Sequence, residues 1–347
     1  MLDVGSNTVH LLVVDARRGG HPTPMSSTKA SLRLAEAIDG SGKLTRRGAD
    51  KLISTIDELA KIAASSGCAE LMAFATSAVR DATNSDDVLA RVLAETGVAL
   101  QVLSGVDESR LTFLAVRRWY GWSAGRIINI DIGGGSLELS NGVDEEPEVA
   151  LSLPLGAGRL TREWLPDDPP GRRRVAMLRD WLATEIADAG AETLKAGSPD
   201  LAVATSKTFR SLARLTGAAP SGAGPRVKRT LTATGLRQLI AFISRMTAAD
   251  RAELEGVSAE RAPQIVAGAL VAEASMKALA VDSVDICPWA LREGLILRKL
   301  DSEADGSGFV GGADNPASVG GAGNPASAET SVRDARREVA RPKGSTR

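Results

Sequence analysis

Two glycine-rich turns, a domain's length apart in the chain, carry the residue types that bind phosphate groups. The first is Asp3-Val4-Gly5-Ser6-Asn7-Thr8, and the second is Asp131-Ile132-Gly133-Gly134-Gly135-Ser136. Glycine allows backbone N–H groups to approach an anion closely and to point at it together. An aspartate beside such a turn can hold a divalent metal ion, directly or through water. One turn of this kind is weak evidence for a phosphate site, but two such turns predict a pair of loops that close on one phosphate-rich ligand.

The composition of the chain argues against several other classes of protein. Its 347 residues are 43% hydrophobic and 24% charged with a net charge of −1, so no general attraction to nucleic acid or to anionic membranes is expected. No apolar run is long enough to span a bilayer, and the N-terminus lacks the pattern of a signal peptide. Two cysteines, Cys68 and Cys287, are too few for a disulfide scaffold, which favours a cytoplasmic protein. Because His10 and His21 are the only histidines, a carboxylate is the expected base if the protein is a hydrolase.

The apolar spacing predicts strands that alternate with helices. Residues 1–16 are expected to form a turn between two strands; the first is short, or it begins upstream of Met1. Further strands are expected at 71–76, 98–103, 126–131, 136–140, 149–153, 201–204 and 284–287. Helices are expected at 45–64, 85–95, 107–119, 172–187, 206–215, 236–246, 263–280 and 291–300. Asn141-Gly142 is expected to close a hairpin, and the whole pattern predicts the α/β class with mixed sheets.

The composition changes after about residue 302. Residues 311–318 nearly repeat as residues 320–327, and an arginine-rich end follows. Such a segment buries too little apolar surface to offset the entropy of ordering it. We therefore expect a disordered tail over 303–347. Two domains are expected before it, over 1–122 and 123–302, and the last helix could pack back on the first domain.

Three further segments, together with the two turns, occur in the order of the motifs of a known family. They are Ala75-Thr76-Ser77-Ala78-Val79-Arg80, Leu103-Ser104-Gly105-Val106-Asp107-Glu108-Ser109-Arg110-Leu111 and Leu291-Arg292-Glu293-Gly294. Over roughly residues 1–300 the chain resembles the exopolyphosphatase / guanosine pentaphosphate phosphohydrolase family. That family belongs to the superfamily of actin, sugar kinases and heat-shock ATPase domains.

The resemblance implies a fold, a reaction and partners. The implied fold is α/β, with two actin-like (ribonuclease H-like) domains, mixed sheets flanked by helices, and a cleft between the domains. The implied reaction is metal-dependent release of terminal orthophosphate from inorganic polyphosphate, with Mg²⁺ or Mn²⁺, by a homodimer. Longer members have a C-terminal region with a His-Asp pair, and that pair is absent here because no histidine follows His21. The expected substrate is therefore polyphosphate of short chain length. Hydrolysis of guanosine pentaphosphate, phosphotransfer from ATP, and non-catalytic sensing of polyphosphate or alarmones are the alternatives.

The resemblance also assigns roles to residues. It makes Glu108 the base that activates the attacking water. Without the resemblance, the favoured interpretation of Glu108 is a carboxylate at a helix N-terminus that the dipole stabilises, and Asp107 beside it could be the base. The expected phosphate ligands are Gly5, Ser6, Asn7, Thr8, Arg80, Gly133, Gly134, Gly135 and Ser136.

Three carboxylates are candidates for the metal. Asp131 is the expected ligand, and Asp3 is expected to contribute. Glu138 lies two residues beyond Ser136, so strand alternation puts both side chains on one face, where Glu138 could orient water or metal.

Arg33, Lys207 and Arg261 are weaker candidates for contacts with the substrate. Lys207 stands in Ala204-Thr205-Ser206-Lys207-Thr208, where the family usually has glycine. A lysine there would crowd a nucleoside base and attract a phosphate, which favours inorganic polyphosphate over a guanosine substrate. Arg261 precedes a helix and could face either the cleft or water.

Overall fold

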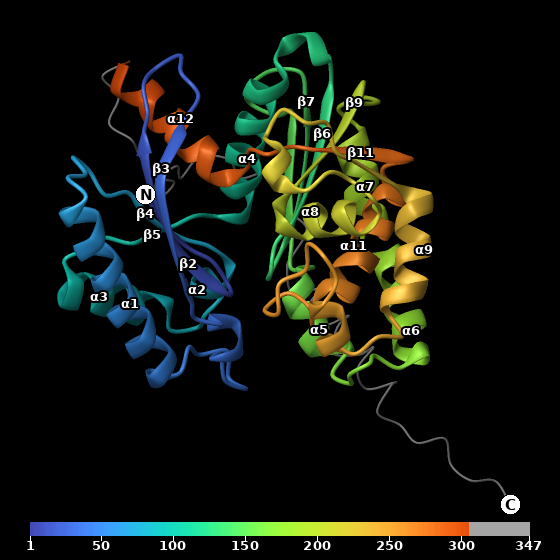
Figure 1. Ribbon diagram of the computed structural model, residues 1–347, viewed down its shortest axis with the longest axis horizontal. Coiled ribbons are helices and arrows are strands. Elements are labelled where there is room, and N and C mark those ends of the chain that lie inside the picture. Colours follow the sequence, from blue (N-terminus) through green and yellow to red (C-terminus); the bar gives the residue numbers. More distant parts are fainter. Residues whose placement is uncertain (305–347) are drawn as a thin grey trace, which may run out of the picture. The chain divides into compact units, whose positions relative to one another are not determined.

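The computed structural model describes residues 1–304, and its architecture is α/β with two mixed sheets, as predicted (Figure 1). The tail expected over 303–347 lies outside these residues except for its first two, which end the last helix. No helix within residues 1–304 is both long enough and apolar enough to cross a membrane.

The first sheet contains five strands in the order β3-β2-β1-β4-β5. They are β1 (Leu2–Val4), β2 (Thr8–Asp15), β3 (Thr23–Ser31), β4 (Ala73–Ala75) and β5 (Gln101–Val102). Strands β1, β4 and β5 run parallel, whereas β2 and β3 are added by antiparallel hairpins.

The second sheet contains six strands in the order β10-β11-β9-β6-β7-β8. They are β6 (Ile127–Ile132), β7 (Leu137–Gly142), β8 (Val149–Leu153), β9 (Leu201–Thr205), β10 (Thr230–Thr232) and β11 (Ser283–Ile286). Strands β8, β7, β6, β9 and β11 repeat the order and directions of β3, β2, β1, β4 and β5. The two glycine-rich turns therefore occupy equivalent places, each between the central strand and its antiparallel neighbour.

The helices surround these sheets (Figure 1). They are α1 (Arg46–Ser65), α2 (Ser77–Arg80), α3 (Ser85–Thr96), α4 (Gly105–Tyr120), α5 (Ala157–Trp164), α6 (Arg172–Glu185), α7 (Ala187–Leu194), α8 (Ser206–Leu215), α9 (Ala233–Ile243), α10 (Ala248–Ala252), α11 (Ile265–Ala278) and α12 (Leu291–Ala304). Three short 3-10 turns occur at Leu34–Glu36, Trp122–Ala124 and Ser221–Ala223.

Strand alternation decides which side chains of the first sheet reach the site. Leu2 and Val4 lie in the core formed with α1 and α3. Asp3, between them, points to the opposite face. Its neighbour on β4, Phe74, packs there with Leu295 of α12. The burial of apolar neighbours on alternate positions therefore directs the Asp3 carboxylate toward the other side of the sheet.

Helix α4 contacts both sheets. Leu111 packs with Phe74 of the first sheet, while Phe113 and Val116 pack with Ile127 of the second. The last helix, α12, also packs on α4 and on the first sheet. The expected boundary at 122/123 falls inside the 3-10 turn Trp122–Ala124, which comes after α4, and it stays a prediction.

Some local expectations were wrong. Asn141 and Gly142 belong to β7, and residues 143–148 connect β7 to β8. The Asn141 amide is buried and donates to the carbonyls of Thr193 and Gly197, both at 2.9 Å, which holds it in the strand. The polar edge strand β3 was not expected, because its mostly exposed Ser, Thr and Lys residues lack an apolar alternation.

Candidate active site

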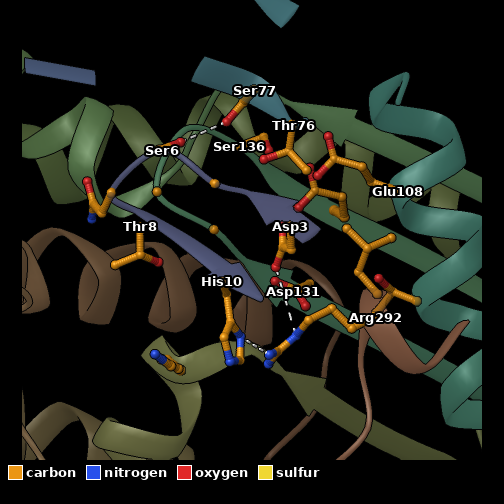
Figure 2. Close-up of a pocket in the computed structure, with 18 of the residues that line it drawn as sticks. Asp3, Ser6, Thr8, His10, Thr76, Ser77, Glu108, Asp131, Ser136 and Arg292 are labelled. Atoms are coloured by element: carbon orange, nitrogen blue, oxygen red, sulfur yellow. Dashed lines mark hydrogen bonds and ion pairs between the residues drawn. The ribbon is translucent and has the colours of Figure 1, made fainter. Parts of the chain in front are cut away.

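A cavity of about 210 Å³ lies where the two glycine-rich turns meet (Figure 2). Of the residues expected from the sequence, those that line it are Asp3, Gly5, Ser6, Asn7, Thr8, Glu108, Asp131, Gly133, Gly134, Ser136, Glu138, Lys207 and Arg261. The expected residues in this wall are separated by up to 258 positions along the chain, the distance from Asp3 to Arg261.

Both turns are closed by the same hydrogen bond. The N–H of Gly5 donates to the carbonyl of Thr8 at 3.0 Å, and that of Gly133 donates to Ser136 at 2.9 Å. This bond is the end of the antiparallel ladder in each hairpin. It fixes the two residues between as a tight loop that projects from the strand ends.

The carbonyls of the turns are taken up by protein donors. Those of Gly133 and Gly134 each accept at 3.0 Å from the N–H groups of Ala157 and Arg159 at the start of α5. Around the first turn, the Ser6 and Asn7 carbonyls accept from backbone N–H groups of residues 32, 33 and 35. Within residues 1–304, the N–H groups of Ser6, Asn7, Gly134 and Gly135 have no hydrogen-bond acceptor. The donors of Ser6, Asn7 and Gly134, which line the cavity, are the ones that a phosphate between the turns would use.

The turns approach each other so closely that glycine is required in the second one. A Cβ on Gly134 would lie 3.0 Å from the Cβ of Ser6, and one on Gly135 would overlap the Ser77 hydroxyl. The Ser6 and Ser77 hydroxyls are themselves 3.0 Å apart. Gly135 therefore packs beneath Ser77 and does not line the cavity.

Helix α4 separates the roles of its two neighbouring carboxylates. Ser104 is its N-cap; the Ser104 hydroxyl accepts from the Asp107 N–H at 3.1 Å and donates to the Asp107 carboxylate at 2.6 Å. Glu108, one residue later, is 8% exposed and faces the cavity. The geometry thus gives Asp107 the capping role, and Glu108 is the carboxylate of this helix that faces the cavity.

Arg80 contacts Glu108 and is not part of the cavity wall. Its Nη1 donates to the Glu108 carboxylate and, at 3.2 Å, to the Leu103 carbonyl, while Nε donates to Asp81 at 3.1 Å. Asp81 also accepts from Arg159 of α5 at 2.5 Å. Arg80 therefore orients Glu108 and belongs to a chain of ion pairs that joins α2 to α5.

Two carboxylates, one half-buried and one buried, stand side by side on the second sheet. Asp131 on β6 is directly opposite Glu138 on β7. The flanking strands each supply a hydroxyl: Ser152 donates to Glu138 at 3.0 Å, and Thr205 donates to Asp131 at 2.5 Å. Burial raises the pKa of Asp131; burial and then the Asp131 charge raise the pKa of Glu138 to about 8.

Glu108 completes this acidic cluster. Burial, followed by the charge of Glu138, raises its pKa well above the usual value, and Arg80 opposes the rise. The cluster binds protons more tightly in the folded protein than in the unfolded chain. It is therefore a place where a cation would be stabilised.

The carboxylates at the site are few for a divalent metal held by protein alone. Within residues 1–304, no group of three His, Cys, Asp or Glu side chains is placed to hold a metal by itself. Mg²⁺, however, is usually bound by one or two carboxylates, with water and substrate phosphates completing the shell. The pair Asp131 and Glu138 fits that requirement, whereas Asp3 already lies 3.8 Å from the Arg292 guanidinium.

These pKa shifts predict how stability depends on pH in metal-free protein. Because the folded protein holds protons on Glu138 up to about pH 8, and the unfolded chain only up to about 4.5, the free energy of unfolding falls as pH rises through this window. The slope is at most about 1.4 kcal/mol per pH unit for one proton. Denaturant unfolding in EDTA at pH 5, 6.5 and 8 measures it. Glu138→Gln is expected to flatten the curve, and an unchanged slope in that variant would contradict the assignment.

Three cations stand at the edge of the cavity without an acidic partner. Lys29, Lys207 and Arg261 make no ion pair within the described part of the chain. Burial, followed by the nearby cations, lowers the pKa of Lys207 to about 8. The same three side chains also line a second cavity of about 620 Å³, whose wall includes Arg210 and Arg214.

The structure places the Arg33 side chain away from the cavity. Its guanidinium is 56% exposed and lies 3.8 Å from Glu36. The Arg33 backbone adopts a left-handed φ of 53° and its N–H donates to the Asn7 carbonyl at 2.9 Å. It therefore supports the first turn through its backbone.

Several residues of the cavity wall were not among the candidates. Thr76, Ser77 and Arg292 lie inside segments that carry the family resemblance, so the sequence did contain a signal for them. His10 follows the first turn on the same face as Asp3, which strand alternation could have shown. Lys29 comes from β3, and the polar character of that strand left no signal.

Two sheets of the same strand order, each with a glycine-rich turn at the shared cavity, define an α/β protein built from two similar halves around one site. The chain belongs to the Ppx/GppA phosphatase family, whose model matches residues 13–303.

Relatives and solved structures agree with this membership. The chain is 85% identical to Exopolyphosphatase 1 of Mycobacterium tuberculosis (strain H37Rv), over 89% of this chain and 90% of that protein. It is 80% identical to Exopolyphosphatase 1 of Mycobacterium leprae, over 97% of this chain and 94% of that protein. Two solved structures share the fold. One is an exopolyphosphatase from Cytophaga hutchinsonii, with a TM-score of 0.77, 22% identity, and coverage of 88% of this chain and 97% of that one. The other is the Aquifex aeolicus family member, with a TM-score of 0.72, 23% identity, and coverage of 87% and 97%.

Proposed function

We propose that the protein is an exopolyphosphatase, a hydrolase that releases terminal orthophosphate from inorganic polyphosphate. The observation that carries this proposal is the placement of the buried Glu108 carboxylate at a cavity between two turns with free N–H donors. The names of the relatives at 80–85% identity support the same reaction.

In this proposal, the terminal phosphate lies between the two glycine-rich turns. The N–H groups of Ser6, Asn7 and Gly134 would donate to its oxygens, where charge is spread in the transition state. Water attacks the phosphorus, and Glu108 accepts the proton that the water loses. The bridging oxygen leaves with the rest of the chain, which is one phosphate shorter.

Arg80 supports this step through Glu108. A base must be ionised before it accepts a proton, and burial beside Glu138 opposes ionisation. The contact with the Arg80 guanidinium favours the carboxylate and holds its orientation. Arg80 is therefore a positioning residue for the base.

Asp131 and Glu138 would hold the divalent metal, for which Mg²⁺ or Mn²⁺ is proposed. When bound, the metal would neutralise negative charge on the phosphates. It would also relieve the repulsion between the two carboxylates, which burial makes costly.

The remainder of the polyphosphate chain is proposed to continue past Lys29, Lys207 and Arg261 into the second cavity. These three cations are common to both cavities and lack acidic partners within residues 1–304. Each internal phosphate carries a negative charge, so a path lined by unpaired cations suits an inorganic chain. The homodimer implied by the family resemblance is part of the proposal and can be tested by light scattering.

Phosphate release by the purified full chain tests the proposed function. Short polyphosphate, long polyphosphate, guanosine pentaphosphate and ATP are compared, each with Mg²⁺, with Mn²⁺ and with EDTA. Metal-dependent release from polyphosphate, abolished by EDTA, is the expected result. Faster release from guanosine pentaphosphate would assign that nucleotide as the substrate. No release from any of the four would contradict hydrolysis and leave phosphotransfer or binding.

A further inference from the structure

Arg292 reaches the cavity from the first turn of α12. Its side chain is 23% exposed; Nε lies 3.8 Å from the Asp3 carboxylate, and Nη1 contacts Nδ1 of His10 (Figure 2). Asp3 and His10 are directly opposite each other on β1 and β2, so their side chains share one face of the sheet. The first hairpin thus presents two side chains to one guanidinium.

The hydrogen bonds determine the state of His10. A guanidinium only donates, so Nδ1 of His10 accepts from Arg292 and the ring proton is on Nε2. Nε2 donates to the Ser27 hydroxyl on β3 at 2.6 Å. Burial, followed by the charges of Arg292 and Lys29, lowers the pKa of His10 to about 3, in agreement with a neutral ring.

The equivalent positions of the two hairpins carry opposite chemistry. In the second hairpin, Asp131 is opposite Glu138, and two carboxylates face the cavity. In the first, His10 stands opposite Asp3, in the place that corresponds to Glu138. Lys29 on β3 continues that row beyond His10. The second sheet therefore offers two carboxylates to a cation, whereas the first sheet has the neutral His10 ring and the Lys29 cation in the corresponding row.

We propose that Arg292 binds a phosphate group that follows the terminal one in the substrate, and that His10 and Asp3 are positioning residues for its guanidinium. This inference rests on the proposed function, because it assumes a polyphosphate chain in the cavity. Arg292 lies near Lys207, which lines both cavities, rather than between the turns that take the terminal phosphate.

Two protein partners leave other donors of the guanidinium free for the substrate. Arginine has five N–H donors in a planar fork, which matches the oxygens of a phosphate. A long side chain loses conformational entropy when a ligand orders it, and prior contacts with Asp3 and His10 remove part of that cost. Loss of either partner would therefore weaken substrate binding, although neither partner contacts the substrate itself.

Binding of tripolyphosphate, measured by calorimetry in EDTA, tests the role of Arg292. The parent protein carries Glu108→Gln, so that the ligand is not consumed. Adding Arg292→Gln is expected to weaken binding about 10- to 100-fold, as for the loss of charge-assisted hydrogen bonds. The matched control is Arg298→Gln, on the same helix, where the guanidinium pairs with Glu146 outside the cavity. Its affinity is expected to stay within about twofold of the parent.

Three His10 combinations separate positioning from packing. Glutamine can accept and donate like the neutral ring, so His10→Gln is expected to keep most of the affinity, whereas His10→Phe loses about 10-fold. In protein that already carries Arg292→Gln, His10→Phe is expected to add little. A structural role would give the same loss in both backgrounds and no rescue by glutamine. Thermal unfolding of each variant identifies any that fail to fold. If His10→Phe does not fold, His10→Gln and Arg292→Gln still test the proposal.

The outcomes distinguish this inference from the proposed function. If wild-type protein releases phosphate from polyphosphate but Arg292→Gln binds tripolyphosphate as tightly as the parent, the assignment of Arg292 is wrong and the function stands. Additive losses for His10 and Arg292 overturn the positioning role. If the parent does not bind tripolyphosphate and the wild type releases no phosphate, both proposals are wrong.

Discussion

Replacing Glu108 with glutamine is expected to lower kcat on polyphosphate by about 10²- to 10⁴-fold, the usual loss for a well-placed general base. Glutamine has nearly the same shape but cannot accept the proton from water. Glu108 is buried at the cavity, and burial beside Glu138 raises its pKa toward the range in which a base works. Binding is expected to change little, because the turn N–H groups that hold the terminal phosphate are unaffected.

Steady-state phosphate release and tripolyphosphate binding together measure this effect. The matched control is Asp107→Asn, the same kind of change one residue earlier. The Asp107 side chain accepts from Ser104 at the helix cap, and asparagine can still accept there. We expect Asp107→Asn to retain most of the activity. Near-normal turnover by Glu108→Gln, or loss of turnover only in Asp107→Asn, would show that the base has been assigned to the wrong carboxylate.

Gly156→Ala is expected to reduce kcat/KM by about 100-fold through displacement of the second turn. Gly156 is the N-cap of α5, with φ −74° and ψ 152°, a conformation that alanine adopts without strain. A Cβ there would overlap the backbone of Gly135 and Ser136, so the turn must shift away. A misplacement of about 1 Å at a reacting group can cost about 10²-fold in rate.

Gly171→Ala provides the control for this prediction. Gly171 is also a helix N-cap, with φ −63° and ψ 137°, and a Cβ there would meet nothing within 4 Å. Its kinetics are expected to match the wild type. Thermal unfolding and kinetics are measured for both variants. If Gly156→Ala keeps its activity, the second turn does not need this position to bind phosphate.

Local patterns in the sequence predicted most of the elements. The stripe of Leu52, Ile56 and Leu59 marked α1, and these residues are buried against the first sheet. The run Ile127–Ile132 marked β6, whose apolar residues are almost fully buried. Such signals are strong because each depends on the period of one element. The predictions missed the polar strand β3 and misplaced the hairpin at Asn141-Gly142. Both errors arose because neighbours distant in sequence decide the structure at those positions.

For the site, the sequence by itself determined which residue types were available and where the two turns lie. Glycine, serine and aspartate at the ends of apolar strands already indicated phosphate binding, because that chemistry depends on the backbone of a few consecutive residues. The family motifs then pointed to Glu108 over Asp107.

Only the tertiary structure decided which of those residues reach the cavity and which of them contact one another. It separated Asp107 at the helix cap from Glu108 at the cavity, and it turned Arg80 toward Glu108. It also brought Arg292 to His10, 282 positions away, and left the Arg33 side chain in solvent. The physical reason is that a hydrogen bond, a desolvated charge or a close backbone approach depends on distance in space. The packing of α4 and α12 against the two sheets sets that distance, and no local pattern encodes it.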